Sequence, residues 1–329
     1  MSTLNKFLKP LRLQLGPRLL PGVVLVALFS VWPGGLGSSA AEATFLPPRL
    51  PALGAVVAPQ PVDWSRVPTL NDLHLTSRSA VVVRLPDGRL MGALDPEHVL
   101  PLASLTKVMT AVLTMELNTK LDRVITFTKE ANTDLISPYV AAGDSVSHIA
   151  IANGATMRLK DVLSAALVGS ANNAAAALAQ SSGLSTTNFV ARMNERAHVL
   201  GMNSTSFTDS TGLNPGNISS AYDYAILARY AWANKTLRTL SGQPQVYLSS
   251  LSGKHYSIRN TNSLVSRPPK GVTAIASKTG YLNEAGYNLA FAWRNKNGAE
   301  YLVVLLGAPT LNNRITDARK IISWLQPKS

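Results

Sequence analysis

The sequence of 329 residues contains no cysteine, and aromatic residues make up only 6% of it. Without cysteine the protein can form no disulfide, no thiolate metal site and no cysteine nucleophile, so its stability must come from a packed core. The five histidines are scattered and show no zinc-ligand spacing, which argues against metal catalysis, and we expect no cofactor. Hydrophobic residues reach 46%, which is enough for a substantial core.

Acidic residues are also scarce, since 31 basic residues face 18 acidic ones and the formal net charge is +13 at pH 7. Such an excess favours polyanionic partners, namely nucleic acid, anionic lipid or an acidic cell-wall polymer. The charge by itself does not choose among these three.

The N-terminal residues 1–43 have the layout of a secretory signal peptide, with four basic residues, an apolar run over 19–32 and small residues over 38–43. The apolar run has about 14 residues, fewer than the roughly 18 to 20 that a membrane-spanning helix needs. We therefore expect cleavage after Ala43, with an uncleaved anchor as the alternative. The mature chain would be periplasmic or secreted, without a stable membrane span, and its charge would suit an anionic wall better than nucleic acid.

Residues 44–68 contain six prolines and little periodicity, which is typical of an extended linker. We expect the folded domain over residues 69–329, a length that suits one α/β domain or a larger lobe with a helical insert. The chain ends soon after its last motif, so we expect no extra C-terminal domain.

Within this domain, strand patterns occur at both ends and helical patterns in the middle. Alternation and turn residues predict strands over 79–85, 89–94, 273–277, 287–294 and 301–306. Apolar periodicity predicts helices that begin near residue 104 and cover 158–167, 171–180, 186–200, 221–232 and 313–325. The short links force neighbouring strands to be antiparallel. The sequence thus predicts an α/β fold of the α+β type, with an antiparallel sheet between helical layers.

The first chemical motif is Ser104 with Lys107, whose spacing puts the hydroxyl and the amine on one helical face. A serine is a weak nucleophile until a base takes its proton, and a lysine in a water-poor pocket can have a pKa low enough to act as that base. The helix N-terminus also offers a backbone N–H and a positive dipole end to an oxyanion. The structural alternative is a helix-capping serine beside a surface lysine.

The second motif is Ser170 with Asn172, at a break between two helical patterns. A hydroxyl here can relay protons, and an amide can both donate to and accept from a peptide. The alternative is that Ser170 caps the alanine-rich helix that follows.

The third motif, Lys278-Thr279-Gly280, closes a strand-like run. An edge strand can offer an ammonium, a hydroxyl and free backbone groups to an extended peptide, and Gly280 permits a close approach. Lys278 would attract a substrate carboxylate, Thr279 would bond to it, and the N–H of Tyr281 would be a second oxyanion donor. A strand-end lysine before a turn is the alternative.

Because all three motifs occur once and in this order, the sequence resembles the penicillin-recognising serine hydrolases. Within them it resembles the D-alanyl-D-alanine carboxypeptidases of peptidase family S11, over residues 75–325. The stretches that carry the resemblance are 101–111, 200–213 and 277–281. Residues 259–265 and 281–286 are most similar to the penicillin-binding protein 7 type, the D-alanyl-D-alanine endopeptidases.

The resemblance implies a β-lactamase/transpeptidase-like fold with a helical subdomain beside the sheet. It also implies that Ser104 attacks a D-Ala-D-Ala or D-Ala-diaminopimelate bond, that Lys107 takes its proton, and that Ser170 and Asn172 help deliver the proton to the leaving amine. Water then frees the acyl-enzyme. Peptidoglycan peptides would be the substrates and β-lactams covalent inhibitors, and the motifs do not choose between carboxypeptidase and endopeptidase.

Two alternatives belong to other classes. A β-lactamase would share the fold and motifs but needs a deacylating base, often a glutamate on a loop between the second and third motifs. Glu195 is the only glutamate in that interval, and it falls in the helix predicted over 186–200. A basic wall-binding protein with vestigial catalytic residues is the other alternative, and the intact motifs argue against it.

Overall fold

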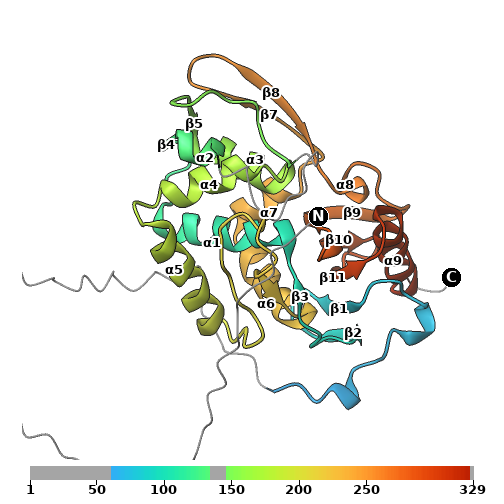
Figure 1. Ribbon diagram of the computed structural model, residues 1–329. Coiled ribbons are helices and arrows are strands. Elements are labelled where there is room, and N and C mark those ends of the chain that lie inside the picture. The colour runs from blue at the N-terminus through green and yellow to red at the C-terminus, as the bar shows by residue number, and fades with distance from the viewer. Residues whose placement is uncertain (1–60, 134–145, 327–329) are drawn as a thin grey trace, which may run out of the picture. The chain divides into compact units, whose positions relative to one another are not determined.

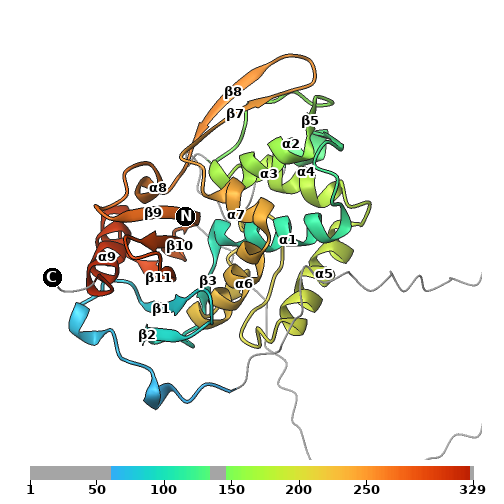
Figure 2. The ribbon, with the colours of Figure 1, turned by 180° about the vertical axis from the view of Figure 1, so that it is seen from behind.

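The structure is a computed structural model that describes residues 61–133 and 146–326, all within one compact unit, Arg49–Ser329. The signal peptide expected over 1–43 and most of the linker expected over 44–68 lie outside the described residues. A five-stranded antiparallel sheet with the order β2-β1-β11-β10-β9 forms the centre of this unit (Figures 1 and 2). Its strands are β1 (Ser79–Arg84), β2 (Leu90–Leu94), β9 (Val272–Leu282), β10 (Gly286–Asn295) and β11 (Glu300–Ala308).

The two ends of the domain meet inside the sheet, because β1 pairs with β11 from Ser79 opposite Leu306 to Arg84 opposite Tyr301. Side chains alternate between the two faces of a strand. Val81 and Val83 therefore join one hydrophobic cluster, while Ala80 and Val82 join the other. The sheet is buried on both faces, as expected for a layer between helices.

Helices cover each face of the sheet. On one face lie α6 (Ala221–Ala233) and α7 (Lys235–Ser241), and on the other α8 (Ser263–Ser266) and α9 (Leu311–Trp324) (Figure 1). Ala318, Ile321 and Ile322 of α9 pack in one cluster with Phe291 and Trp293 of β10. Burying apolar side chains of this size stabilises the fold by roughly 1.5–3 kcal/mol each.

A helical subdomain lies beside the sheet, and Figure 1 labels its helices. Its helices are α1 (Lys107–Leu117), α2 (Lys129–Thr133), α3 (Leu159–Val168), α4 (Asn172–Gln180) and α5 (Thr186–Val199). Outside the central sheet there are three short antiparallel strand pairs among the described residues: β4 (Val124–Thr126) with β5 (Thr156–Arg158), β3 (Leu100–Pro101) with β6 (Ile218–Ser219), and β7 (Gln245–Ser249) with β8 (His255–Arg259). Single turns of 3₁₀-helix are η1 (Trp64–Arg66), η2 (Asn71–Leu73) and η3 (Ala103–Thr106).

This arrangement confirms the predicted fold class, with differences at particular elements. The strand predicted over 273–277 is longer, because β9 continues to Leu282 and carries the whole third motif inside the sheet. The helix expected to begin near Ser104 begins as the 3₁₀ turn η3 and becomes α-helical at Lys107. The β7–β8 hairpin was not predicted from the sequence, although Val246, Leu248, Tyr256 and Ile258 alternate with polar residues or an exposed tyrosine along its two strands.

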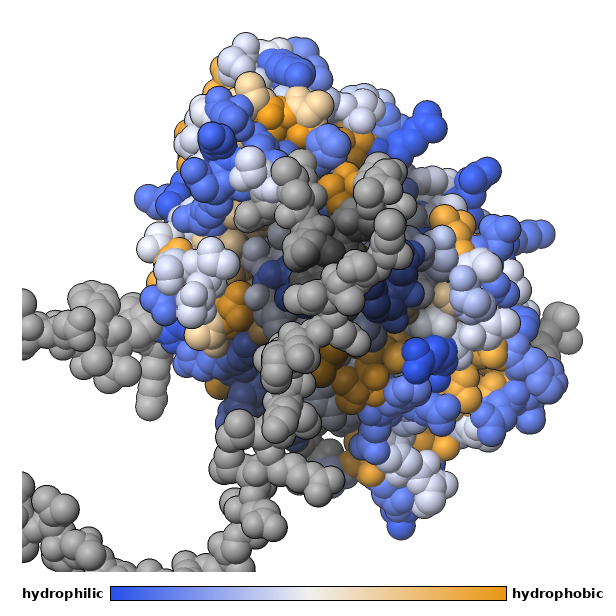
Figure 3. Space-filling view, viewed as in Figure 1, coloured by the Kyte–Doolittle hydropathy of each residue, from blue (hydrophilic) through white to orange (hydrophobic). Residues whose placement is uncertain are grey.

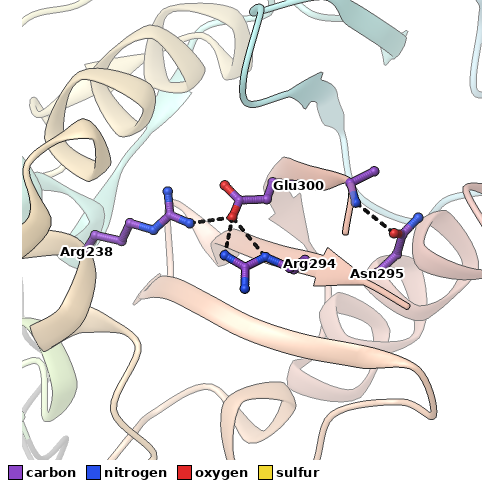
Figure 4. Close-up of polar contacts among 5 residues, drawn as sticks. Arg238, Arg294, Asn295 and Glu300 are labelled. Atoms are coloured by element: carbon purple, nitrogen blue, oxygen red, sulfur yellow. Dashed lines mark hydrogen bonds and ion pairs between the residues drawn. The ribbon is translucent and has the colours of Figure 1, made fainter. Parts of the chain in front are cut away.

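Glu300 ties α7 to the sheet (Figure 4). Its Oε1 accepts hydrogen bonds of 2.6 Å from Arg238 of α7 and from Arg294 of β10. Burial opposes ionisation of Glu300, but the two guanidinium groups outweigh it and lower the pKa of the carboxyl. Next to this cluster, Asn295 accepts from the backbone N–H of Ala299 and shapes the turn between β10 and β11.

None of the helices within 61–133 and 146–326 is long and apolar enough to cross a membrane. On the face shown in Figure 3, hydrophilic residues predominate and apolar residues form small separate patches.

Candidate active site

Ser104 lies in the η3 turn, which neighbouring elements hold from several sides. The amide of Asn288 on β10 donates to the carbonyls of Pro101 and Leu102, and Tyr224 of α6 donates to the carbonyl of Leu105 at 2.9 Å. The residue before the serine, Ala103, has a φ of 50°, which is unusual for a side chain other than glycine. The turn thus presents Ser104 in a fixed and mildly strained position.

Lys107 follows on the same face and its amine contacts the Ser104 hydroxyl. The Nζ–Oγ distance is 2.7 Å, and the Nζ also donates to Asn172 Oδ1 at 2.7 Å and to the Thr211 carbonyl at 2.5 Å. Lys107 is 0% exposed. Burial lowers its pKa to about 7, and the charge of Asp209 partly opposes that shift. Near neutral pH a large fraction of this amine is uncharged and able to accept a proton.

Ser170 and Asn172 stand where α3 ends and α4 begins. Ser170 has a φ of 61° and is buried, and its hydroxyl accepts from the Lys278 amine at 2.8 Å. The Asn172 amide is oriented at both ends, since its oxygen accepts from Lys107 and its nitrogen donates to the Ser147 carbonyl at 3.1 Å. The second motif therefore links the lysines of the first and the third.

Lys278 is enclosed within β9, at 1% exposure. Burial lowers the pKa of its amine well below the ordinary value, and the neighbouring charges of Lys107 and Arg314 lower it further. Its Nζ donates to Ser170 and to the Thr279 carbonyl at 2.7 Å. The expectation that Lys278 attracts a substrate carboxylate stays a prediction, and in the structure its amine contacts Ser170 and the Thr279 carbonyl from behind the cavity wall.

Thr279, Gly280 and Tyr281 follow on β9, the edge strand of the sheet. The Thr279 hydroxyl shares a hydrogen bond of 2.6 Å with Thr261. A methyl group on Gly280 would stand 2.6 Å from the Leu102 carbonyl oxygen, so only glycine lets β9 approach the serine turn this closely. Tyr281 is 48% exposed and its ring lies 4.3 Å from that of Tyr287.

A cavity of about 520 Å³ opens along this edge of the sheet. Ser104, Ser170, Asn172, Thr279, Gly280 and Arg314 are among its lining residues. Lys107 and Lys278 do not line it and lie behind its wall. The serines are therefore accessible from the cavity, while the amines that contact them are shielded from solvent.

Arg314 supplies the cation of this cavity. It lies on α9, its Nη1 donates to the Asn288 carbonyl at 3.2 Å, and its guanidinium carbon lies 5.7 Å from the centre of the Tyr287 ring. Burial lowers its pKa to about 10, so it stays protonated at neutral pH. Among the residues described, its buried Nε has no hydrogen-bond partner.

The structural alternatives for the motifs find little support. Ala171, not Ser170, is the N-cap of α4, and Thr106, not Ser104, is the N-cap of α1. Lys107 is buried and is no surface lysine. Glu195, considered as a β-lactamase base, lies on α5 with its side chain 55% exposed and paired with Arg192. Among the described residues, no carboxylate lines the cavity.

Metal binding finds no support in the described part of the chain, because residues 61–133 and 146–326 hold no cluster of three His, Asp or Glu side chains that could bind an ion.

Sequence analysis missed Arg314, Thr211 and Asp209. Arg314 had a signal, because it shares a helical stripe with the buried Ala318, Ile321 and Ile322 of α9, where a basic residue is unexpected. Thr211 acts through its backbone carbonyl and Asp209 through loop geometry, and neither leaves a pattern in the sequence.

The fold and the site define a serine hydrolase in which a serine that lines the cavity contacts a buried lysine. The family model described as D-alanyl-D-alanine carboxypeptidase matches residues 66–310. The chain therefore belongs to the D-alanyl-D-alanine carboxypeptidase family, peptidase family S11, as the resemblance of its motifs indicated.

Individual relatives agree with this assignment. The D-alanyl-D-alanine endopeptidase of Haemophilus influenzae is 36% identical over 237 residues, 72% of this chain and 76% of the relative. That of Pseudomonas aeruginosa is 30% identical over 259 residues, 77% of this chain and 78% of the relative. Among solved structures, the Streptomyces K15 DD-transpeptidase matches with a TM-score of 0.68 and 25% identity, over 76% of this chain and 97% of that chain.

Proposed function

We propose that this serine D,D-peptidase cleaves peptidoglycan peptides through an acyl-enzyme on Ser104, with Lys107 as the base. The observation that carries the proposal is the 2.7 Å contact between the Ser104 hydroxyl and a fully buried amine whose pKa is lowered to about 7. Such an amine accepts a proton near neutral pH, which an exposed lysine does not.

The proposed reaction uses the hydroxyl, amine and backbone N–H groups of this site. Ser104 Oγ bonds to the carbonyl carbon of the D-alanyl residue and its proton passes to Lys107. The oxyanion accepts from the backbone N–H groups of Ser104 and Tyr281. The C–N bond then breaks, and the proton held by Lys107 is delivered to the leaving amine with the help of Ser170, whose hydroxyl contacts Lys278. Lys107, neutral again, takes a proton from the water that attacks the ester and returns it to Ser104 Oγ as the acid leaves.

Arg314 would bind the carboxylate of the leaving residue, since it is the cation among the described residues that line the cavity. Lys278 would act in the proton relay. Thr279 and Gly280 would hold the substrate backbone along the edge of β9.

We further propose that the bonds cleaved include cross-links, so that the enzyme is an endopeptidase. This proposal is supported by the names of the two relatives cited above, which are both D-alanyl-D-alanine endopeptidases. The proposed site of action is outside the cytoplasm, in the periplasm or secreted, and the signal peptide expected over residues 1–43 supports it. β-Lactams would acylate Ser104 and inhibit the enzyme.

The test is digestion of purified cross-linked and uncross-linked muropeptides, with products identified by mass. We expect the wild type to convert cross-linked dimers to monomers, and Ser104→Ala to release nothing and to bind no labelled penicillin. Cleavage that survives in Ser104→Ala would overturn the mechanism. Release of terminal D-alanine alone, with dimers intact, would make the enzyme a carboxypeptidase. Rapid turnover of penicillin without a lasting adduct would favour a β-lactamase.

A further inference from the structure

The three hydrogen-bonding contacts of the Lys107 amine determine whether its lone pair faces Ser104. A neutral amine has two N–H donors and one lone pair, whereas the ammonium has three donors. Of the three groups around the Nζ, Asn172 Oδ1 and the Thr211 carbonyl can only accept. They take the two N–H groups of the neutral amine and leave its lone pair for the Ser104 hydroxyl. The position of the Thr211 carbonyl is therefore part of the base.

That carbonyl belongs to the 209–214 loop, which the Asp209 carboxylate organises. Its Oδ1 accepts from the backbone N–H of Thr211 at 2.5 Å and of Gly212 at 2.6 Å, and from the Thr211 hydroxyl at 2.9 Å. Its Oδ2 accepts from the backbone N–H of Asn214 at 2.7 Å. One carboxylate thus binds three backbone N–H groups of a single turn, and the carbonyls of that turn are left to face elsewhere.

Those carbonyls face α1. The Ser210 carbonyl accepts from Thr110 at 2.6 Å, one turn beyond Lys107, and the Thr211 carbonyl accepts from Lys107 itself. Gly212 packs so closely that a methyl group there would stand 2.0 Å from the Ala103 carbonyl oxygen. The 209–214 loop is held between η3 and α1 with little freedom.

Among the residues that the structure describes, two charged or titratable groups interact with the Lys107 amine: Lys278 on β9 and Asp209 on the 209–214 loop. The helix α4 presents the neutral Asn172, and the Arg196–Glu116 pair between α5 and α1 lies at the other end of α1. Asp209 is thus the carboxylate that acts on this amine, and its charge opposes the effect of burial on the pKa of Lys107.

We propose that Asp209 is a positioning residue of the active site, which holds the Thr211 carbonyl on Lys107 and sets a negative charge opposite the buried amine. The proposal rests on the proposed function, in which Lys107 is the base. Asp209 does not touch the substrate. It acts by fixing the orientation of the Lys107 amine and by raising the pKa of that amine.

The test measures the rate constant for acylation of Ser104 by a labelled penicillin from pH 5 to 9. In the wild type, the rate should rise with pH as Lys107 loses its proton. In Asp209→Asn this rise should move to lower pH, because a missing negative charge favours the neutral amine. The maximal rate should also fall at least roughly tenfold, because the amide nitrogen cannot accept from Asn214 and the Thr211 carbonyl shifts.

Two further variants separate charge from structure. Asp209→Glu keeps the charge, so its pH profile should stay near that of the wild type even if its maximal rate falls. Asp223→Asn is the matched control, because Asp223 also accepts from a backbone N–H, that of Ser204 at 2.7 Å, and from the Thr205 hydroxyl. It should keep both the wild-type profile and the wild-type rate.

A wild-type pH profile in Asp209→Asn would overturn the proposal, as would a shift in Asp209→Glu or Asp223→Asn equal to that in Asp209→Asn. A wild type that no penicillin acylates would instead refute the proposed function, so the two failures are distinguishable.

Discussion

Lys107 and Lys278 are both enclosed by protein, a placement that an amine tolerates when it gives up its charge or shares its protons. Their Nζ atoms contact Ser104 and Ser170 respectively. Ser104 and Ser170 thus each have an amine behind them, and Asn172 accepts a hydrogen bond from the first of these amines.

For Lys107 we predict that the acylation rate rises with pH through about 7, the value to which burial lowers its pKa. Below that pH the ammonium cannot accept the Ser104 proton, and above it the amine can. Lys107→Arg should reduce acylation by roughly 100-fold or more, because a guanidinium does not act as a base. Penicillin labelling over this pH range is the measurement. A rate that rises only near pH 10 would contradict a buried base.

For Arg314 we predict that Arg314→Gln lowers kcat/KM for peptides with a free C-terminal carboxylate by roughly 10- to 100-fold, the value of hydrogen bonds to a charged group. The same peptides with an amidated C-terminus should be nearly unaffected. Arg319→Gln is the control, since Arg319 is on the same helix but exposed. Equal losses on both peptides would show that Arg314 supports the fold and does not recognise the carboxylate.

At the scale of elements, the site depends on three backbone segments that approach closely: η3, the 209–214 loop and β9. Gly212 and Gly280 stand at the two contacts, against the carbonyls of Ala103 and Leu102. Both glycines are needed for space, and Gly212 also has a φ of +86°.

The matching prediction compares Gly212→Ala with Gly183→Ala. Both glycines have positive φ, but a methyl group on Gly183 meets nothing within 4 Å. Gly183→Ala should therefore cost about 1 kcal/mol for the backbone alone. Gly212→Ala should cost about 3 kcal/mol, because the clash with a backbone carbonyl adds to it. Thermal or denaturant unfolding measures both, and equal losses would mean that the loop moves freely.

Element prediction worked where one pattern dominated. The strands of the sheet and helix α9 follow from alternation and apolar periodicity, and their bounds differ by a few residues. The extension of β9 through the third motif was not predicted, because Lys278 interrupts the apolar run and suggests a strand end. Inside the sheet the pairing of Lys278 with Ala290 continues the strand, and the amine finds Ser170 as a partner. A tertiary contact thus overrides a local pattern.

At the scale of the whole molecule, the cavity is lined from both the sheet and the helical subdomain, so their relative placement decides its geometry. Away from the cavity, Glu116 of α1 binds Arg196 of α5 at 2.9 Å and accepts from Tyr230 of α6 at 2.6 Å. The Glu116 side chain is 0% exposed and that of Arg196 is 5% exposed. This cluster joins the helix that carries Lys107 to two neighbouring helices.

We predict that Glu116→Gln lowers the free energy of unfolding by roughly 3–5 kcal/mol, because it leaves the Arg196 charge buried without a partner. Glu195→Gln, which breaks the partly exposed pair with Arg192, should cost about 0–1 kcal/mol. Urea unfolding followed by circular dichroism checks both values. Similar small losses would show that water or another group compensates Arg196.

The sequence by itself determined the family, the fold class and the three motifs, because spacing along a helix or strand is a local property that residue order specifies. The tertiary structure alone decided which ionisable side chains are buried and in which direction their pKa values move. Burial lowers the pKa values of Lys107 and Lys278, and it leaves Arg314, 36 positions beyond the third motif's lysine, as the cation of the cavity. Burial and the direction of a backbone carbonyl depend on segments far apart in the chain, and no local pattern encodes them.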